Sequence, residues 1–200
     1  MVDRFLLCLP YTLVQEARPG TTPAEWVNSD GSINEACWNN PKNFSNDAHD
    51  PGGKTFCGII QREYDLWRKG HSQPVQDVRK MTVAEGTAIY RIAYWMPHCP
   101  SLPPGLDMDF FDESVNSGTS EAIRILQVAL GIADDGEWGV NTTAAVTLSA
   151  SAPAKAVEAF TNRRALVYRE MKGFPYFGTD WLRRTAEIGA EALKMAGGQS

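Results

Sequence analysis

The sequence predicts a mainly α-helical protein. Apolar residues recur at helical spacing near the start of the chain, as Phe5, Leu9 and Leu13 show. A Thr-x-x-Glu capping box, Thr82 with Glu85, marks the start of a later helix. No segment has the alternation of apolar and polar residues that indicates a half-buried β-strand. These three observations together favour a helical fold.

Helix ends are predicted from prolines, glycines and capping residues. Pro10 would kink the first helix or mark its first turn, and Pro19 with Gly20 would end that helix. Ser120 is a candidate cap for one later helix, and Asn141 or Thr142 for the next. The expected helices cover residues 5–16, 58–69, a stretch from 82, a stretch through 110–115, and residues 120–130, 142–148, 155–171 and 180–195.

Three segments between these helices are irregular. Residues 18–43 are polar and rich in turn-forming residues, with Trp26 and Trp38 expected to pin the segment to the body. Four prolines make residues 96–105 a rigid loop. Residues 174–181 form an aromatic turn that we expect to pack back on the body. Trp95, Trp138, Tyr176 and Trp181 are interpreted as core residues rather than as platforms for sugars.

Composition excludes several classes of protein. Two hundred residues suit one domain, with or without a small appendage. The net charge of −5 and the lack of a Lys/Arg stripe argue against a nucleic-acid partner. The early apolar run from Phe5 to Leu9 is too short to span a membrane. Asp3 and Arg4 cancel in charge, so we expect no signal peptide.

No metal or other cofactor is expected. The cysteines Cys8, Cys37, Cys57 and Cys99 are scattered, and the three histidines lack ligand spacing. The acidic turn at Asp135 lacks the alternating ligands of a calcium loop. Reduced thiols are the default expectation, and Cys37 with Cys57 is the first pair to test for a disulfide.

The candidate catalytic residues are Glu16 and polar residues in the loop of residues 44–59. Cleaving a glycosidic bond needs a carboxylic acid that protonates the leaving oxygen and a second polar group that stabilises the cation or positions water. Glu16 follows an apolar helix, where burial would favour a protonated acid. Asp50 precedes Pro51 in a glycine-rich loop and fits the second role, while Thr55 could orient a water. A solvated Glu16 and an ordinary surface turn remain the alternatives.

Residues 44–59 resemble the signature loop of glycoside hydrolase family 108 lysozymes, which reads roughly Tyr-x-Asn-Asp-x-x-Asp-Pro-Gly-Gly-x-Thr-x-x-Gly-Ile. Members of this family are N-acetylmuramidases of phages and bacteria. The resemblance continues in order along nearly the whole chain. It includes Ile89-Tyr90-Arg91, Tyr94-Trp95, Phe111-Asp112 with Val115-Asn116-Ser117-Gly118, Leu126-Gln127 with Leu130-Gly131, Asp135-Gly136-Glu137-Trp138-Gly139 with Thr142, Arg163-Arg164, Tyr168 and Gly178-Thr179-Asp180-Trp181-Leu182-Arg183-Arg184.

The resemblance implies a lysozyme-like helical fold in two parts. Residues 1–110 would form the catalytic domain, with residues 17–43 as an insertion, and residues 111–200 a helical peptidoglycan-binding region packed against it. The implied reaction is hydrolysis of the β-1,4 bond between N-acetylmuramic acid and N-acetylglucosamine. Glu16, Asp50 and Thr55 would be catalytic, and His49 and Asn116 would bind substrate.

One departure concerns the acid. The family places its catalytic glutamate in a Glu-Gly-Gly-Tyr segment, and this chain has no such tetrapeptide. By its place at the end of the first helix, Glu16 takes that position. Glu35, in Glu35-Ala36-Cys37-Trp38, is the rival, but it lies in the polar insertion. We favour Glu16 because its helix supplies apolar packing.

The resemblance also implies a biological setting. The expected protein is a bacteriolytic, endolysin-type enzyme of a phage, held in the host cytoplasm until a holin-type partner releases it to the periplasm and cell wall. Two alternatives stay open: a non-catalytic cell-wall-binding module on the same fold, and a lytic transglycosylase.

Overall fold

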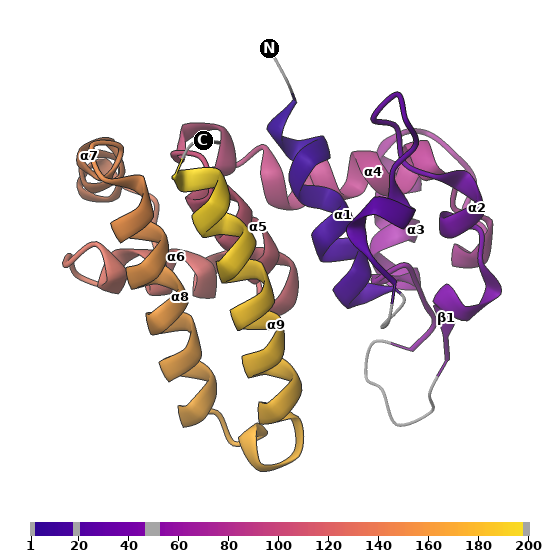
Figure 1. Cartoon of the computed structure of the whole chain (residues 1–200). Coiled ribbons are helices and arrows are strands. Elements are labelled where there is room, and N and C mark those ends of the chain that lie inside the picture. The colour runs from indigo at the N-terminus through magenta and orange to yellow at the C-terminus, as the bar shows by residue number, and fades with distance from the viewer. Residues whose placement is uncertain (1–2, 18–20, 47–52, 198–200) are drawn as a thin grey trace. The chain divides into compact units, whose positions relative to one another are not determined.

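The structure is a computed structural model that describes residues 3–17, 21–46 and 53–197. The chain divides into two compact units, residues 1–93 and 94–200, which we call the first and second units. The described residues are mostly helical (Figure 1), which confirms the predicted fold class. None of the helices they form combines the length and apolar character needed to cross a bilayer.

The first unit combines helices with one small sheet. Its elements are α1 (Arg4–Glu16), η1 (Pro23–Trp26), α2 (Glu35–Trp38), η2 (Pro41–Asn43), β1 (Phe44–Ser45), β2 (Thr55–Phe56), β3 (Ile59–Ile60), α3 (Gln61–Gly70), η3 (Val78–Lys80) and α4 (Val83–Tyr90). A π-helical turn, η4 (Arg91–Trp95), continues the chain from α4.

Helix α1 forms where the apolar spacing predicted it. Asp3 caps its start by accepting a hydrogen bond from the backbone N–H of Phe5 at 3.2 Å. Pro10 lies inside the helix and is buried. Phe5, Leu9 and Leu13 are fully buried, so one face of the helix belongs to the core of the first unit.

The sheet of the first unit is antiparallel in the order β1-β2-β3. Phe56 pairs with Ile59, so only Cys57 and Gly58 form the turn between β2 and β3. Both have positive φ, 47° and 75°, as a two-residue turn matched to the strand twist requires. The prediction of a helix from residue 58 is therefore wrong at its start: strand β3 comes first, and α3 begins at Gln61.

The polar segment before the sheet is pinned by its two tryptophans. Trp26 and Trp38 are fully buried, which confirms that they pack. The indole N–H of Trp38 donates to the carbonyl of Met81 at 3.0 Å. Gly86 makes room for that ring, because a methyl group there would lie 2.1 Å from it. The polar segment is thus held in place by the side chain of Trp38, which packs against Gly86 of α4.

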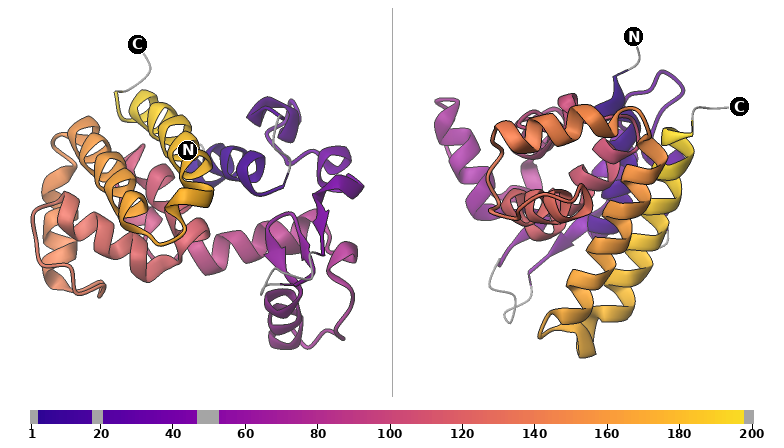
Figure 2. Two further views of the ribbon diagram at one scale, coloured as in Figure 1. Left: turned by 90° about the horizontal axis from the view of Figure 1, so that it is seen from below. Right: turned by 90° about the vertical axis from the view of Figure 1, so that its left-hand side faces the viewer.

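The regular elements in the described residues of the second unit are all helices. Its elements are η5 (Cys99–Ser101), α5 (Leu106–Ser117), α6 (Thr119–Ala129), α7 (Val140–Ser149), α8 (Pro153–Glu170) and α9 (Phe174–Ala196). Helices α8 and α9 form a long antiparallel hairpin (Figure 2), and both pack against α5. At the start of α5, Gly105 lies so close to α9 that a methyl group there would stand 2.2 Å from the carbonyl oxygen of Ala192.

Several helix starts differ from prediction. Helix α6 is capped by Gly118 rather than by Ser120, and α7 by Gly139 rather than by Asn141 or Thr142. Helix α9 begins at Phe174, so the expected aromatic turn is helical. The predicted division near residue 110 would fall inside α5, whereas the units divide after Ala93. Helix α5 packs against η5, which precedes it, and against α6, α8 and α9, all of which lie in the second unit, and this explains the earlier division.

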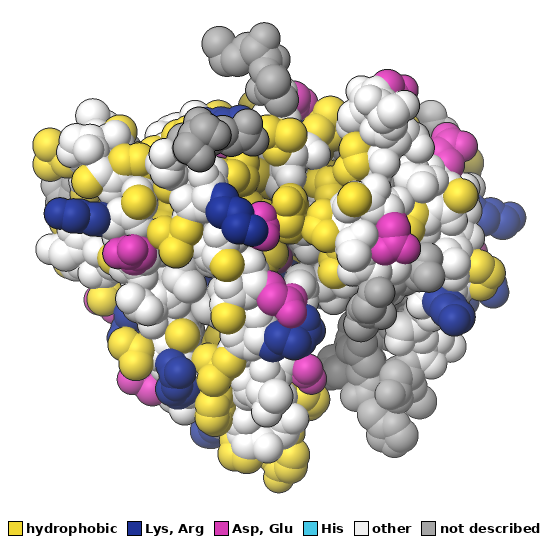
Figure 3. Space-filling view, in the orientation of Figure 1, with side chains coloured by type: hydrophobic (Ala, Val, Ile, Leu, Met, Phe, Trp, Pro, Cys, Tyr) yellow, Lys and Arg dark blue, Asp and Glu magenta, His cyan; other side chains and the backbone are white. Residues whose placement is uncertain are grey.

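The aromatic residues that were predicted to pack in the core differ in their exposure. Trp95 is buried, as predicted for a core residue. Tyr176 is 84% exposed and Phe177 56%, so the prediction that they pack on the body is wrong. They lie in the first turns of α9, where apolar side chains gather at the lower end of the hairpin (Figure 3).

Candidate active site

Glu16 is the last residue of α1, and the packing of that helix positions it. The neighbouring Leu13 and Ala17 are buried, while Glu16 itself is only partly exposed. The backbone N–H of Ala17 donates to the carbonyl of Leu13 at 2.9 Å, so the helical geometry continues past Glu16. The carboxyl group is therefore carried by an ordered, anchored helix end.

The side chain of Glu16 lies against the turn between β2 and β3. A Cβ atom built on Gly58 would stand 2.7 Å from Cβ of Glu16 and 2.6 Å from the hydroxyl oxygen of Tyr90. Real Cβ atoms do not approach other atoms so closely, so only glycine allows this contact. The positive φ of 75° at the same residue also favours glycine. Gly58 thus brings the end of α1 onto the hairpin.

Tyr90, at the end of α4, fixes the same turn from another side. It is 1% exposed, and its hydroxyl donates to the carbonyl of Cys57 at 2.8 Å. A buried backbone carbonyl in a turn needs such a partner, because leaving it unpaired costs roughly 1–3 kcal/mol. Three elements, α1, the β2–β3 turn and α4, therefore meet around Glu16.

Thr55 begins the same hairpin, in β2. Its hydroxyl donates to the carbonyl of Gly53 at 3.2 Å and thereby ties the end of the glycine-rich loop to the strand. The oxygen keeps lone pairs with which it can accept a hydrogen bond from water. Both Glu16 and Thr55 therefore belong to one local assembly, Glu16 through its contact with the turn and Thr55 through the strand that leads into it.

A polar pocket adjoins the strand of Thr55. Its volume is about 290 Å³, and it is lined by Lys54, Gln61, Asp65, Val75, Gln76 and Asp77. Lys54 and Asp77 form an ion pair across 3.3 Å. Hydrogen bonds from Arg79 outweigh the other influences on Asp77 and lower the pKa of its carboxyl group, so it is ionised at neutral pH. Carboxylate, amide and ammonium groups of this kind can hydrogen bond to sugar hydroxyls.

The other predicted site residues are placed differently. Asp50 and His49 lie outside the described residues. Asn116 lies on α5 in the second unit, where its amide N–H donates to the hydroxyl of Tyr168 at 2.6 Å. Its amide oxygen accepts from Arg184 at 3.0 Å. Both ends of the Asn116 side chain are thus engaged within that unit, and its role in substrate binding stays a prediction.

Glu35, the rival acid, has different surroundings from Glu16. It lies in the first turn of α2 and is exposed. It lines a groove of about 590 Å³ whose walls include the apolar side chains of Leu6, Ile33 and Ile92 and the charged Arg91. The three atoms nearest to a Cβ built on Gly58 belong to Tyr90 and Glu16, and none belongs to Glu35.

The cysteines and possible metal ligands add no chemistry in the described residues. The four cysteines are buried free thiols, so the Cys37–Cys57 pair is not joined. Burial raises the pKa of the Cys57 thiol well above its usual range, which keeps it protonated. No group of three His, Cys, Asp or Glu side chains in the described part of the chain has the arrangement of a metal site.

Sequence reasoning missed the supporting roles of Gly58 and Tyr90. Both stand in segments that resemble family motifs, Gly58 in the signature loop and Tyr90 in Ile89-Tyr90-Arg91. The glycine in the loop was a signal for close approach or positive φ. Nothing in the sequence linked it to the end of α1, because that contact joins residues far apart in the chain.

Comparison with known proteins places the fold and one segment of the sequence among known proteins. SagA of Brucella abortus has a similar structure, with a TM-score of 0.72, 24% sequence identity, and coverage of 98% of this chain and 97% of that one. This likeness shows a shared fold. No curated protein matches the chain. Residues 42–118 match the family model described as Glycosyl hydrolase 108. The resemblance to glycoside hydrolase family 108 is thus confirmed over residues 42–118, and this match supports a glycoside hydrolase.

Proposed function

We propose that this protein is an N-acetylmuramidase, which hydrolyses the β-1,4 bond between N-acetylmuramic acid and N-acetylglucosamine in peptidoglycan. Glu16 protonates the leaving glycosidic oxygen. Asp50 stabilises the positive charge that develops on the sugar or activates the water. Thr55 helps to position that water.

The contact between Glu16 and Gly58 is the observation that carries this proposal. It joins a carboxyl group at the end of α1 to the hairpin that begins with Thr55 and lies within the family match. A general acid must lie within hydrogen-bond reach of the oxygen that it protonates, and a fixed backbone turn supports such positioning. Tyr90 contributes as a positioning residue, because it holds the turn rather than the substrate.

The polar pocket beside Thr55 supports recognition of the glycan. Its carboxylates, Asp65 and Asp77, and its amides, Gln61 and Gln76, suit a ligand rich in hydroxyl groups. We assign this pocket to a sugar ring next to the scissile bond. The second unit, through its resemblance to peptidoglycan-binding regions, is proposed to hold the enzyme on the cell wall, with Asn116 and His49 as further substrate contacts.

The proposed biological role is bacteriolysis by an endolysin-type enzyme. In this role the protein would stay in the host cytoplasm until a holin-type pore allows it to reach the cell wall. Lysis of cells only when such a pore is co-expressed would support this part of the proposal. Lysis without it would contradict the need for a holin and leave the reaction itself unaffected.

The reaction is tested by digesting purified peptidoglycan and identifying the new ends by mass spectrometry after borohydride reduction. Hydrolysis at the proposed bond gives fragments with a reduced muramic acid end. Reduced glucosamine ends would overturn the bond assignment, and anhydro ends would identify a lytic transglycosylase.

A binding assay in the same experiment separates the non-catalytic alternative. The protein is mixed with the insoluble peptidoglycan, and the pellet and the soluble fragments are both measured. A protein that pellets with the wall and releases no fragments would be a binding module. Release of fragments by the wild type, together with loss of release in Glu16→Gln that still pellets, is the expected result.

A further inference from the structure

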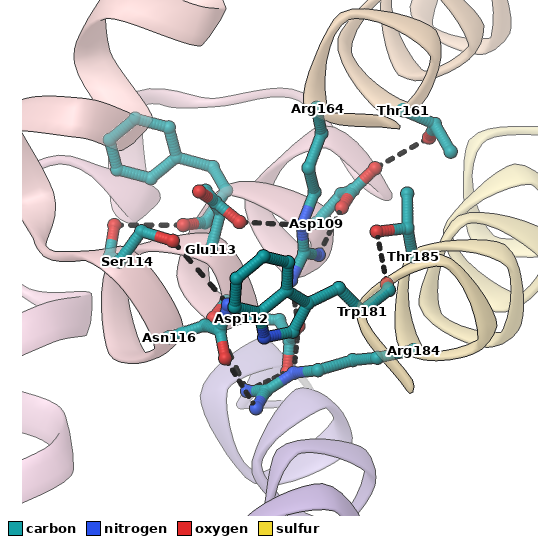
Figure 4. Close-up of polar contacts among 12 residues, drawn as sticks. Asp109, Asp112, Glu113, Ser114, Asn116, Thr161, Arg164, Trp181, Arg184 and Thr185 are labelled. Atoms are coloured by element: carbon teal, nitrogen blue, oxygen red, sulfur yellow. Dashed lines mark hydrogen bonds and ion pairs between the residues drawn. The ribbon is translucent and has the colours of Figure 1, made fainter. Parts of the chain in front are cut away.

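The core of the second unit contains charged side chains from three helices (Figure 4). We define the buried charge cluster as Asp109, Asp112 and Glu113 of α5, Arg164 of α8 and Arg184 of α9. The three carboxyl groups and Arg164 are fully buried, and Arg184 is 7% exposed. Charged groups are rarely removed from water to this extent unless they are paired.

The pairing within the cluster is uneven. Arg164 meets all three carboxyl groups, Asp109 at 2.9 Å, Asp112 at 2.7 Å and Glu113 at 2.5 Å. Arg184 forms a bidentate pair with Asp112 through bonds of 2.9 and 2.8 Å. Asp112 therefore has two guanidinium partners, while Asp109 and Glu113 depend on Arg164 alone.

The charges of the cluster do not cancel if every group is ionised. Three carboxylates would face two guanidinium groups, which leaves one negative charge in a site without contact with water. The other polar groups around it, Thr161 and Tyr168, are neutral, since burial raises the pKa of Tyr168 to about 12. An uncompensated buried charge is costly, and a carboxyl group avoids that cost by keeping its proton.

The charged groups of the neighbouring helices include Arg163 of α8, whose Nε is buried without a hydrogen-bond partner in the described structure, and no ion pair joins Arg163 to the cluster. On α6, Arg124 donates to the carbonyl of Asp134, and Glu121 is partly exposed. On α9, Arg183 pairs with Glu187 at the surface. The ring of His98, which lies against Phe110 of α5, stacks on Trp138, and burial lowers the pKa of its imidazole. Asp107, also on α5, accepts from the backbone N–H groups of Gly105 and Met108.

The hydrogen bonds single out Glu113 as the site of the proton. Asp109 has both oxygens bonded, one to Arg164 and one to the hydroxyl of Thr161 at 2.5 Å. Glu113 uses one oxygen for Arg164 and the hydroxyl of Tyr168, and its Oε1 has no hydrogen-bond partner within the described structure. A proton on Oε1 of Glu113 therefore displaces no hydrogen bond, whereas a proton on either oxygen of Asp109 would compete with a donor already bound there.

The pKa directions of Asp109 and Glu113 agree with a proton held in the cluster. Burial raises the pKa of Glu113, and it raises that of Asp109 as well. For Asp112, burial opposes ionisation, but Arg184 and Arg164 together lower the pKa of its carboxyl group to about 2. Because the groups interact, the cluster takes up and releases protons as a unit.

We propose that the buried charge cluster holds one proton at neutral pH, on the side chain of Glu113, and that losing this proton in alkaline solution loosens the α8–α9 hairpin from α5. A group that binds its proton more tightly in the folded state stabilises that state at low pH. This stabilisation is complete below the ordinary glutamate value of 4.5 and is lost as pH rises through the folded value. The second unit is thus built to open as the solution becomes alkaline.

Carbon-13 NMR of protein labelled at the glutamate carboxyl carbons tests the location of the proton. The spectra are recorded in the Glu16→Gln variant, so that the proposed catalytic acid does not contribute. One glutamate signal is expected to remain neutral at pH 7 and to titrate in the alkaline range. The signal should disappear in Glu16→Gln/Glu113→Gln and persist in the matched control Glu16→Gln/Glu121→Gln. A complete set of ionised glutamates at pH 7, or a neutral signal that survives the Glu113 substitution, would overturn the proposal.

Hydrogen exchange of the α9 amides tests the loosening itself. The exchange rates are corrected for the intrinsic effect of pH on amide exchange. The equilibrium constant for opening of α9 in the wild type should then increase by up to about tenfold per pH unit between pH 7 and 9. Glu113→Gln, which imitates the protonated group, should show a flat profile, and equal slopes in the two proteins would contradict the mechanism. If Glu113→Gln does not fold, Glu113→Asp replaces it in the NMR experiment. The neutral signal should then disappear from the spectrum of the labelled glutamates, because residue 113 is an aspartate. A neutral glutamate signal that persists would refute the assignment of the proton to Glu113.

Discussion

The two units of this protein differ in how deeply their ion pairs are buried. In the first unit, neutral side chains donate to buried backbone carbonyls, as Tyr90 does to Cys57 and Trp38 to Met81, and the ion pair of Arg68 with Glu85 keeps 10% and 16% side-chain exposure. In the second unit, guanidinium groups pair with carboxylates that are fully buried. Neutral hydrogen bonds fix a backbone turn and do not depend on pH. Buried ion pairs make the core sensitive to any change in charge, because one lost partner leaves others unpaired.

The largest expected effect is the loss of Arg164. Arg164→Met would leave Asp109 and Glu113 without a cation and should destabilise the second unit by about 3–5 kcal/mol. Urea unfolding followed by tryptophan fluorescence measures this change. Arg183→Met is the matched control, since the pair of Arg183 with Glu187 lies at the surface, and it should cost less than about 1 kcal/mol. Equal effects in the two variants would remove the distinction between buried and exposed pairs.

The next effect concerns the turn beside Glu16. Gly58→Ala should destabilise the first unit by about 2–3 kcal/mol, because a methyl group there meets Glu16 and Tyr90 and the residue has positive φ. It should also lower the rate of peptidoglycan hydrolysis. Gly31→Ala is the control: Gly31 has a φ of 84° but nothing within 4 Å of an added Cβ. Similar loss of activity in both variants would show that backbone strain alone is responsible.

Acid should weaken the ion pairs in the core of the second unit. Arg184 and Arg164 offset the burial of Asp112 and lower the pKa of its carboxyl group to about 2, so its stabilising contribution is present above pH 4 and lost between pH 4 and 2. The second unit should lose roughly 2 kcal/mol over this range. Circular dichroism during urea unfolding at several pH values measures the slope. Asp112→Asn should lower stability near neutral pH and remove this acid dependence, and an unchanged slope would contradict the assignment to Asp112.

The smallest predicted effect tests the hydrogen bond of Tyr90. Tyr90→Phe keeps the ring and removes the donor to Cys57, so it should cost about 1 kcal/mol. The catalytic rate should fall more than substrate binding, because the turn positions Glu16. Tyr176→Phe, at an exposed site, should change stability by less than about 0.5 kcal/mol. Thermal unfolding and steady-state kinetics on soluble glycan fragments measure both, and wild-type kinetics in Tyr90→Phe would exclude a positioning role.

Local signals in the sequence predicted much of the helical fold. Thr82 and Glu85 form the capping box that their spacing indicated, with the Thr82 hydroxyl accepting from the backbone N–H of Glu85 at 3.2 Å. Helix α1 follows its apolar spacing. Ser120 was a weaker signal, because Gly118 with a φ of 91° already starts α6. Ile59 and Ile60 form a strand because pairing with β2 decides their conformation, and pairing is not a local property.

The polar core could not be predicted from local pattern. Asp109, Asp112 and Glu113 lie at helical spacing, and such a pattern usually indicates a solvated acidic face. Their burial depends on Arg164 and Arg184, which belong to helices much later in the chain. At the candidate site, Glu16 was identified from its helix and from the family resemblance. Its contact with Gly58 depends on tertiary structure and had no local signal.

The release of fragments from purified peptidoglycan by Glu16→Gln and Glu35→Gln, measured side by side, tests the central claim most directly. Glutamine keeps the shape of either side chain and cannot donate a carboxyl proton. Glu16→Gln is expected to lower the rate by about 10²–10⁴-fold while the fold is retained, and Glu35→Gln is expected to leave the rate near that of the wild type. An active Glu16→Gln together with an inactive Glu35→Gln would contradict this expectation and transfer the acid to the groove at α2.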